Sequence, residues 1–484
     1  MRRALTGVVV TIVMGAGLTL GAAPASGGTA CGAATITGTS GDDTIDGTAG
    51  PDVIDALDGE DTVDGMGGDD VICGGPGRDR LLGGDGADVL EGGLAQDTLL
   101  GGIGDDDLAG GANADTLSGG DGNDTLSGDA GNDTLKGNDG IADRATFHSS
   151  RHGVSVNLER GVAFGDGADR LGGIEDVVGS RFIDALLGDT GKNSIEGAGG
   201  ADAIRGSGAN DRLLGGAGPD RLFGGGGNDI AGSGPGNDRV DAGTGADDVN
   251  AGPGNDAVAA GKGGDVVRGA GGADTLDAGN ASGGSDDLIG GRGNDTIGGG
   301  SGDDHLTGGP GVDVATWAAV GHAVDASLVE GRATGNGTDR LSGIDGLTGT
   351  DQRDTLTGDG GANTLRGSGG NDRLAGLGGN DKAFGGDGRD TLRGDAGNDR
   401  LQGGTGNDTL LMSDGADTGG GGVGDDRLAG GDGDDELNGN DDKDTLGGGS
   451  GQDRLDGGRG IDSGDGGPDN DECVNVEDEH SCSR

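Results

Sequence analysis

The sequence predicts an all-β fold, a parallel β-solenoid of stacked short strands, from three observations. A nine-residue unit repeats without gaps over Gly110–Lys136, which reads GGANADTLS, GGDGNDTLS and GDAGNDTLK. The same frame recurs along most of the chain, and self-similarity at a short fixed period is typical of solenoids. The 484 residues include only six aromatic residues, which leaves too little large apolar surface for conventional globular cores.

Each place of the unit has a chemical reason. Glycine is favoured at places one, two and four, because it adopts backbone conformations that side chains forbid. The aspartate at place six offers a hard carboxylate beside the carbonyl oxygens of a folded-back turn. The closing triplet, such as Thr125–Leu126–Ser127, reads as a short strand with one inward apolar residue. Two units then make one coil of eighteen residues, so each turn stacks on the turn two units further along.

Composition limits the classes of function. The net charge is −55 and 126 residues are glycine, a balance that normally indicates disorder. The strict period argues against disorder, provided that something neutralises the aspartates. A chain this acidic is poorly suited to nucleic acids or anionic membranes, because phosphate contacts need Lys and Arg. We therefore expect cations or cationic surfaces as partners, with cell-surface or matrix material as a further possibility.

Residues 1–25 are typical of a secretory signal peptide. Arg2 and Arg3 supply the positive start, the apolar run spans residues 8–20, and Ala23–Pro24–Ala25 is a cleavage site, with Gly28–Thr29–Ala30 as a second possibility. The run is too short and too often broken by glycine to span a membrane stably. We expect a secreted, extracellular chain with no transmembrane segment after cleavage.

The repeat divides the chain into three arrays. The first, with an N-terminal cap, covers 26–136, the second 183–307 and the third 354–471, and 472–484 form a C-terminal cap. In the first array, eleven consecutive units from Asp43 to Asp133 carry aspartate at place six and an aliphatic residue at place eight. The second array slips by three residues within 278–285 and then regains the frame. The copy at 412–420 is degenerate, with Gly419 at its strand centre.

Two segments, 137–182 and 308–353, interrupt the period and match each other at an offset of 170 residues. Phe147 corresponds to Trp317, and Asp169–Arg170–Leu171 corresponds to Asp339–Arg340–Leu341. They read as one duplicated, strand-rich insert with one fold. Because four of the six aromatic residues lie here, we expect a thicker local core.

Fifteen strict GGxGxD matches among forty in-frame units give the chain a family resemblance. It resembles the RTX (repeats-in-toxin, haemolysin-type) calcium-binding proteins. The resemblance implies a right-handed parallel β-roll that binds several Ca²⁺ ions between stacked turns, for instance at the pair Asp106 and Asp124. It also implies inserts that continue the solenoid without calcium loops.

Calcium takes six to eight oxygen ligands, carbonyl oxygens included, so one unit cannot complete a site alone. An ion at each of the 38 aspartate-bearing units would bring 76 positive charges to a chain of net charge −55, so we expect partial filling. Filling should be weakest at Asn193, Asn363 and Asp417. The predicted metal ligands are Asp79, Asp88, Asp106, Asp115, Asp124, Asp133, Asp211, Asp220, Asp229, Asp295, Asp304, Asp313, Asp390, Asp399, Asp408, Asp426, Asp435, Asp453 and Asp462.

The four cysteines lie as one pair near each end of the chain. In a secreted protein this favours two disulfides, Cys31 with Cys73 and Cys473 with Cys482. A solenoid needs protection at its open ends, and cross-linked caps would provide it.

Candidates for catalysis are poor, and we expect no enzyme activity. His148 and His152 have the spacing of a zinc-protease pair, but the glutamate of that motif is missing. The RTX enzymes carry a separate catalytic domain, for which this chain has no room. The favoured function is a structural, adhesive or ion-binding solenoid. The alternative is an extracellular hydrolase or polysaccharide-modifying enzyme with a site on the roll or the inserts, for which only His148, His152 and Glu175 stand near one another. Ice binding would need identical residues along one face, and the third-place residues vary.

Overall fold

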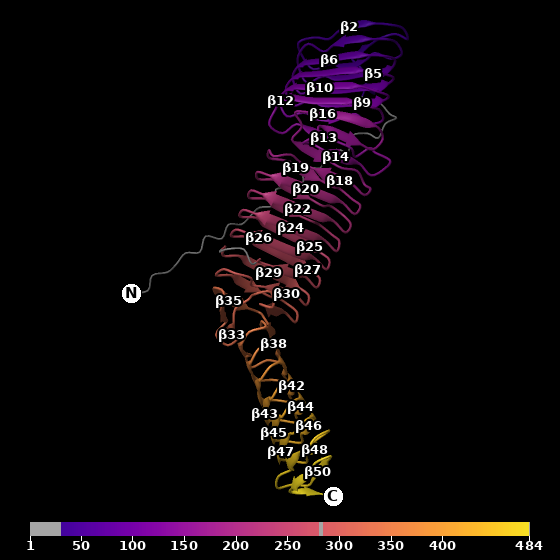
Figure 1. Cartoon of the computed structure of the whole chain (residues 1–484). Helices are drawn as coiled ribbons and strands as arrows, with labels where there is room; N and C mark the ends of the chain where they lie inside the picture. The colour runs from indigo at the N-terminus through magenta and orange to yellow at the C-terminus, as the bar shows by residue number, and fades with distance from the viewer. Residues whose placement is uncertain (1–30, 280–283, 484) are drawn as a thin grey trace, which may run out of the picture.

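The computed structural model describes residues 31–279 and 284–483, and it is a long β-solenoid (Figure 1). These residues form strands and turns and no helix, so none of them forms a helix that could cross a membrane. The predicted all-β fold is confirmed. The predicted signal peptide, residues 1–25, lies outside the described residues.

The strands are short, between two and six residues, as the closing triplet of the unit predicts. The first array contains β1 (Ile36–Thr37), β2 (Thr44–Asp46), β3 (Val53–Asp55), β4 (Thr62–Asp64), β5 (Val71–Pro76), β6 (Arg80–Asp85), β7 (Val89–Leu94), β8 (Thr98–Ile103), β9 (Asp107–Ala112), β10 (Thr116–Asp121), β11 (Thr125–Ser127) and β12 (Thr134–Asp139). The second contains β18 (Ala185–Leu187), β19 (Ser194–Glu196), β20 (Ala203–Gly208), β21 (Arg212–Leu214), β22 (Arg221–Gly226), β23 (Ile230–Gly232), β24 (Arg239–Thr244), β25 (Asp248–Pro253), β26 (Ala257–Lys262), β27 (Val266–Gly271), β28 (Thr275–Asp277), β29 (Asp287–Arg292), β30 (Thr296–Gly298) and β31 (His305–Thr307).

The third array and the C-terminal cap complete the solenoid. They contain β37 (Thr355–Thr357), β38 (Thr364–Gly369), β39 (Arg373–Gly378), β40 (Lys382–Asp387), β41 (Thr391–Ala396), β42 (Arg400–Thr405), β43 (Thr409–Asp414), β44 (Thr418–Val423), β45 (Arg427–Asp432), β46 (Glu436–Asp441), β47 (Thr445–Ser450), β48 (Arg454–Asp456), β49 (Ser463–Asp465), β50 (Asp471–Val474), β51 (Asp478–His480) and β52 (Cys482–Ser483).

Two parallel sheets form the walls of the solenoid, and successive strands of an array alternate between them. We name sheet A the one that contains β1 and sheet B the one that contains β2. Within each array the register is eighteen residues, as in the column Leu99, Leu117, Leu135 of β8, β10 and β12. The predicted slip in the second array lengthens it to twenty-one residues where β27 pairs with β29 and β28 with β30. These eighth-place residues form the core, and nearly all are fully buried. The eighteen-residue coil therefore follows directly from the nine-residue sequence period.

Met412 fills the core position that the degenerate copy at 412–420 lacks. Its side chain is fully buried, and a Cβ added at Gly419 would lie 2.2 Å from the Met412 terminal methyl carbon. The methionine thus occupies the volume that the missing eighth-place aliphatic residue leaves empty.

The two inserts contain the same five strands at the offset of 170 residues. The first contains β13 (Arg144–Thr146), β14 (Ser155–Asn157), β15 (Val162–Phe164), β16 (Ala168–Gly172) and β17 (Asp176–Val178); the second contains β32 (Val314–Thr316), β33 (Asp325–Ser327), β34 (Arg332–Thr334), β35 (Thr338–Ser342) and β36 (Gly346–Thr348).

In each insert the middle strand runs antiparallel to its two neighbours, which departs from the all-parallel expectation. β15 lies between β14 and β16, and β34 lies between β33 and β35. Short turns reverse the chain at Gly161 and Gly331, which have φ values of 61° in the left-handed region. Glycine adopts that conformation without the penalty that a Cβ brings.

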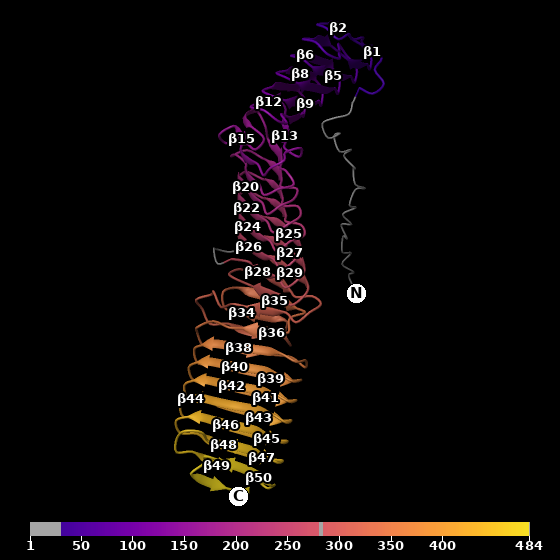
Figure 2. The ribbon, with the colours of Figure 1, turned by 90° about the vertical axis from the view of Figure 1, so that its right-hand side faces the viewer.

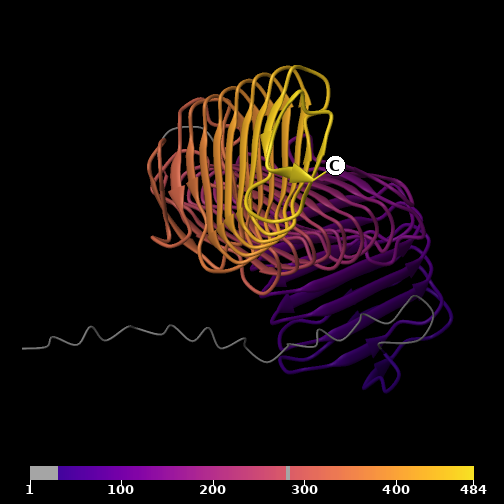
Figure 3. The same cartoon turned by 90° about the horizontal axis from the view of Figure 1, so that it is seen from below.

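Each antiparallel excursion lengthens only one wall. Sheet B runs β12, β16, β15, β14, β18, whereas sheet A runs directly from β13 to β17. In the second insert the extra strands lie in sheet A instead. Two additional strands amount to about 10 Å on one side, because neighbouring strands lie about 4.8 Å apart. The solenoid axis changes direction near both inserts (Figures 1 and 2), and from below the three arrays do not share one straight axis (Figure 3).

Buried side chains of both inserts join the core, although not all of their aromatic residues do. Trp317 is buried, and Phe147 packs against the core at the corresponding position. Phe164 is 53% exposed, because it lies on the opposite face of β15 from the buried Ala163.

Both predicted disulfides are present. Cys31 bonds to Cys73 and Cys473 bonds to Cys482, with Cα–Cα distances of 6.2 and 5.7 Å. Cys473 stands in register with Leu455, so it continues the core column into the last coils. The two bridges therefore fasten the two ends of the described solenoid.

Candidate metal sites

The place-six aspartates form two continuous rows inside the solenoid. In each row a backbone N–H donates to Oδ1 of the aspartate one coil later, as from Asp106 to Asp124 at 2.9 Å and from Asp115 to Asp133 at 2.8 Å. In the third array Asp390 donates to Asp408 in the same way, at 2.8 Å. One carboxylate oxygen of each unit is thus used by the protein itself.

The second carboxylate oxygen is left over. All nineteen predicted metal ligands are at most 3% exposed. Within the described residues, the Oδ2 atom of every one of the nineteen is buried and has no hydrogen-bond partner. A buried charge without a partner costs several kcal/mol, so such an atom indicates a missing positive partner.

Backbone carbonyl oxygens lie close to these orphan atoms. A Cβ added at the place-one residue Gly101 would lie 2.2 Å from Asp106 Oδ2 and 2.6 Å from the Gly119 carbonyl oxygen. The place-two residue Gly102 has a φ of 128°, and a Cβ there would lie 2.1 Å from the Gly84 carbonyl oxygen. At Gly101 and Gly102 an added side chain would therefore collide with the stacked turns unless the backbone shifted. The turns therefore combine carboxylate and carbonyl oxygens, the hard donor set that calcium prefers.

The described residues contain no group of three or more His, Cys, Asp or Glu side chains placed to bind one metal. Each site would rest on aspartates of stacked turns together with turn carbonyls, as predicted for the pair Asp106 and Asp124.

Burial makes these carboxyl groups resist ionisation. It raises the pKa of Asp106, Asp115 and Asp133 to about 7, and neighbouring carboxylates raise it further while a backbone N–H lowers it. Burial likewise raises the pKa of Asp79 and Asp88 to about 6, with the same smaller contributions from neighbouring carboxylates and a backbone N–H. Like charges stacked in a row oppose one another unless protons or cations intervene.

Six of the units that the structure describes in full differ from this pattern, and they are the first two of each array. In these units the place-two N–H donates to the place-six side chain, which satisfies the atom that is orphaned elsewhere. We call these six turns capped, and we call open the turns whose place-six Oδ2 atom is buried and unpartnered. The capping bonds join Thr39 to Asp43 (2.6 Å), Thr48 to Asp52 (2.7 Å), Ser180 to Asp184 (2.6 Å), Asp189 to Asn193 (2.9 Å), Thr350 to Asp354 (2.6 Å) and Asp359 to Asn363 (2.7 Å).

The place-two backbone distinguishes the two kinds of turn. No capped turn has a positive φ at place two, whereas the next unit of each array does, at Leu57 (74°), Ala198 (74°) and Ser368 (81°). Ser, Thr or Asp at place two supports the capped conformation through local bonds, as when Thr48 Oγ1 donates to the Gly50 carbonyl or Asp189 Oδ1 accepts from the Gly191 N–H. The residue type alone does not decide the conformation, because Ser207, Ser368 and Asp129 stand at place two of open turns with a positive φ. Short polar side chains stabilise turns in this way.

The three units expected to bind most weakly do not share one geometry. Asn193 and Asn363 lie in capped turns, and their Nδ2 atoms donate to the carbonyls of Glu175 and Asp345 at 3.0 and 3.2 Å. Asp417 differs, because its Oδ2 is buried and unpartnered like those of the strict loops. Its degenerate strand leaves the turn unchanged.

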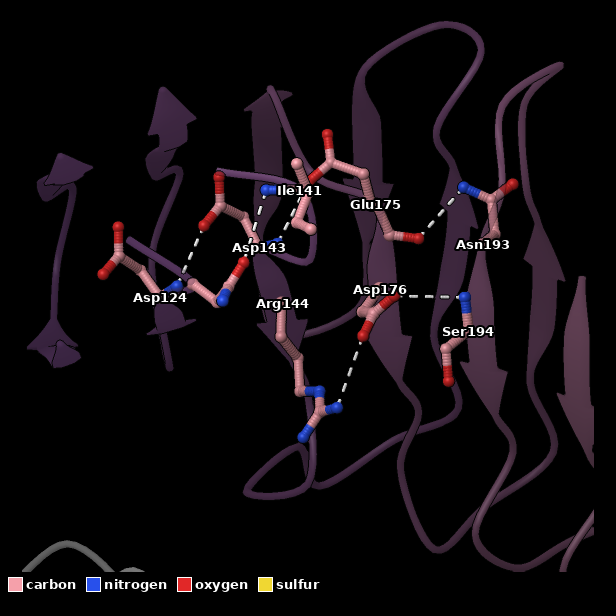
Figure 4. A network of polar contacts seen from close by, with 9 residues as sticks. Asp124, Ile141, Asp143, Arg144, Glu175, Asp176, Asn193 and Ser194 are labelled. Atoms are coloured by element: carbon pink, nitrogen blue, oxygen red, sulfur yellow. Dashed lines mark hydrogen bonds and ion pairs between the residues drawn. The ribbon is translucent and has the colours of Figure 1, made fainter. Parts of the chain in front are cut away.

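Residues outside the frame continue the rows through the inserts. Asp143 accepts the Asp124 N–H at 2.9 Å, and the Asp143 N–H in turn donates to Glu175 Oε2 at 3.0 Å (Figure 4). Asp169 and Asp339 occupy row positions too. The repeated Asp–Arg–Leu triplets have the spacing of places six and eight, a signal that could have identified the latter pair.

The three residues considered for catalysis serve different structures. Glu175 lies in the carboxylate row. His152 lies on an exposed loop, where its Nδ1 is 2.9 Å from Asp166 Oδ1. For His148, the described residues show no polar partner.

A solenoid of stacked turns that bury paired carboxylates beside carbonyl oxygens defines a calcium-binding repeat protein. Comparison with known families agrees. The RTX calcium-binding nonapeptide repeat matches residues 37–72, 74–108, 109–141, 178–213, 205–240, 223–258, 233–267, 250–282, 280–315, 348–383, 384–419 and 420–455. These matches cover more than half of the chain, which belongs to this family. No curated relative matches the chain.

Proposed function

We propose that this chain is a secreted, non-enzymatic protein that folds on extracellular calcium and acts as a structural or adhesive element. The observation that carries the proposal is the set of nineteen buried Oδ2 atoms without a partner among the described residues. They are spread through all three arrays, so the requirement for a cation belongs to the fold as a whole and not to one pocket.

Energetics support calcium-dependent folding. Ordering one residue costs roughly 1–2 kcal/mol of backbone entropy, and glycine costs the most. One buried aliphatic side chain per nine residues returns only about 1.5–3 kcal/mol. The repulsion of the buried carboxylates adds to this deficit. Calcium reverses the sign of that interaction and fixes the turn carbonyls, so its binding energy becomes folding energy.

The affinity of such sites suits an extracellular role. Extracellular calcium modules bind at about 10⁻⁴–10⁻³ M, well above cytosolic calcium. The chain would stay unfolded during export and would fold outside the cell. A long, acidic, calcium-loaded rod suits contact with cell-surface or matrix material better than it suits catalysis. The residues of the first insert considered for catalysis do not form a common site, because Glu175 belongs to the carboxylate row and His152 lies on an exposed loop.

The test is circular dichroism of the full secreted chain, titrated with calcium, with magnesium as the matched control. We expect a disordered spectrum in excess chelator and a β-sheet spectrum at millimolar calcium, with no such change at equal magnesium. A full β-sheet spectrum in chelator would contradict the proposal. Capture of surface material from the producing cells, with and without calcium, would then test the adhesive role.

A further inference from the structure

We propose that the first coil of each array takes no calcium and keeps its fold without it, so that every array is built against a calcium-independent coil. The three coils are residues 38–55, 179–196 and 349–366, which hold the six capped turns. This inference rests on the proposed calcium-dependent folding and specifies which turns are exempt from it.

The first step concerns the hydrogen-bond partners of the place-six carboxylate. In the open turns Oδ2 is buried beside carbonyl oxygens and needs a cation. In the capped turns the same atom accepts the place-two N–H, at 2.6 Å in both Asp184 and Asp354. The hydroxyls of Ser180 and Thr350 donate to these carboxylates as well. Hydrogen bonds of this kind stabilise the charged form of these carboxylates relative to those of the open turns, whose Oδ2 accepts none.

The second step is the pair of asparagines. The second capped turn of the second and third arrays has asparagine at place six, at Asn193 and Asn363. An amide carries no charge for a cation to balance, and here its Nδ2 donates to a carbonyl oxygen of the preceding coil. These coils therefore offer fewer anionic oxygens and fewer open carbonyls to an ion than any open coil does.

The third step is position. The coils at 179–196 and 349–366 begin in the last residues of the inserts, which contain buried side chains such as Trp317, Val320 and Val324. The coil at 38–55 lies within the loop closed by the disulfide between Cys31 and Cys73. Each capped coil is thus supported on one side by packing or a covalent link that does not depend on calcium. It presents the next coil with backbone N–H donors such as those of Asp184 and Asn193, which hold Oδ1 of Asp202 and Asp211 at 2.8 Å.

The test is hydrogen exchange measured by mass spectrometry on the full secreted chain, at saturating calcium, in excess chelator and at steps between them. On calcium removal we expect peptides within 202–277 and 372–471 to lose protection by at least roughly tenfold in exchange rate, and peptides within 179–196 and 349–366 to retain it. Equal loss at one calcium midpoint in both sets would overturn the inference. If no peptide responded to calcium, the proposed function itself would fail, and the two outcomes are distinct.

Two substitutions at one position sharpen the test. T350G removes the side chain that holds the capped conformation and restores the open-turn sequence Gly–Gly at places one and two. We expect it to bring the calcium midpoint of 349–366 to that of 372–471. The matched control T350S keeps the hydroxyl that donates to Asp354, as Ser180 donates to Asp184 in the second array, so we expect its peptides to stay protected in chelator. If T350G impairs secretion, S180G with S180T tests the same point in the second array. Identical behaviour of the glycine variant and its hydroxyl-bearing control would contradict the role assigned to the place-two residue.

Discussion

An open turn of the arrays and the row position at Asp339 in the second insert both bury a carboxylate, but they differ in the partner of its second oxygen. In the arrays, the Oδ2 atom of Asp304 is buried and has no partner among the described residues. One step along the same row, in the second insert, Asp339 Oδ2 accepts the indole N–H of Trp317 at 2.9 Å. The open turn therefore lacks a partner among the described residues, whereas Asp339 finds one within its own insert. Under the proposed calcium dependence, the need for a cation is widespread along the solenoid but differs from one row position to the next.

The largest expected effect concerns protons as substitutes for calcium. Because burial raises the pKa of Asp106 and Asp115 to about 7 in the fold, against 3.8 for an unperturbed aspartate, protonation favours the folded state. The stability gained is complete below about pH 4 and is lost as the pH rises through about 7. We expect the calcium-stripped chain to gain β-sheet signal in circular dichroism when the pH falls from 8 to 5, still above the pI of about 4.1.

Peptides from the arrays should account for that gain in exchange experiments, and those from the inserts should change less. A β-sheet signal that decreases over the same acidification would show that the buried rows do not control the fold.

The features of the fold that repeat along the chain could be predicted from the sequence. The eighth-place residues from Ile54 to Leu455 line the core, and the duplicated inserts have matching strands, because a strict period and a constant offset require it. The disulfides followed from the position of the cysteines near the two ends. Nearly all of the candidate rows could likewise be read from the nine-residue frame.

The features that could not be predicted lie where the nine-residue frame is interrupted, or depend on a single backbone angle. The antiparallel strands β15 and β34 lie where the period is interrupted, so no frame indicates their direction. The capped turns depend on the sign of φ at place two, and Leu57 and Ser368 have positive values although neither is glycine. The rows continue through Asp143 and Glu175 at spacings that the frame does not contain.

A pair of glycine substitutions tests whether close stacking is confined to the arrays. G102V would place a side chain at a φ of 128° with its Cβ 2.1 Å from the Gly84 carbonyl oxygen. We expect a loss of at least about 1–3 kcal/mol at that coil. G172V, in β16 of the first insert, meets no heavy atom within 4 Å and should cost within about 0.5 kcal/mol. Chemical denaturation at saturating calcium, followed by exchange at each coil, measures both, and equal costs would contradict the contrast.

The smallest effect tests the insert's internal partner. W317F keeps an aromatic ring, as Phe147 does in the first insert, but removes the N–H that Asp339 accepts. Because Asp339 is only 5% exposed, its unpaired oxygen should cost about 1–3 kcal/mol. The experiment is a double-mutant cycle with D339N, read from exchange in 314–348 at saturating calcium, with the first insert as an internal reference. In the D339N background the buried charge is absent, so W317F should cost less than it does with Asp339 present. Equal costs in the two backgrounds would mean that Trp317 stabilises the insert by packing alone, and that the insert leaves its carboxylate as dependent on an outside partner as the arrays do.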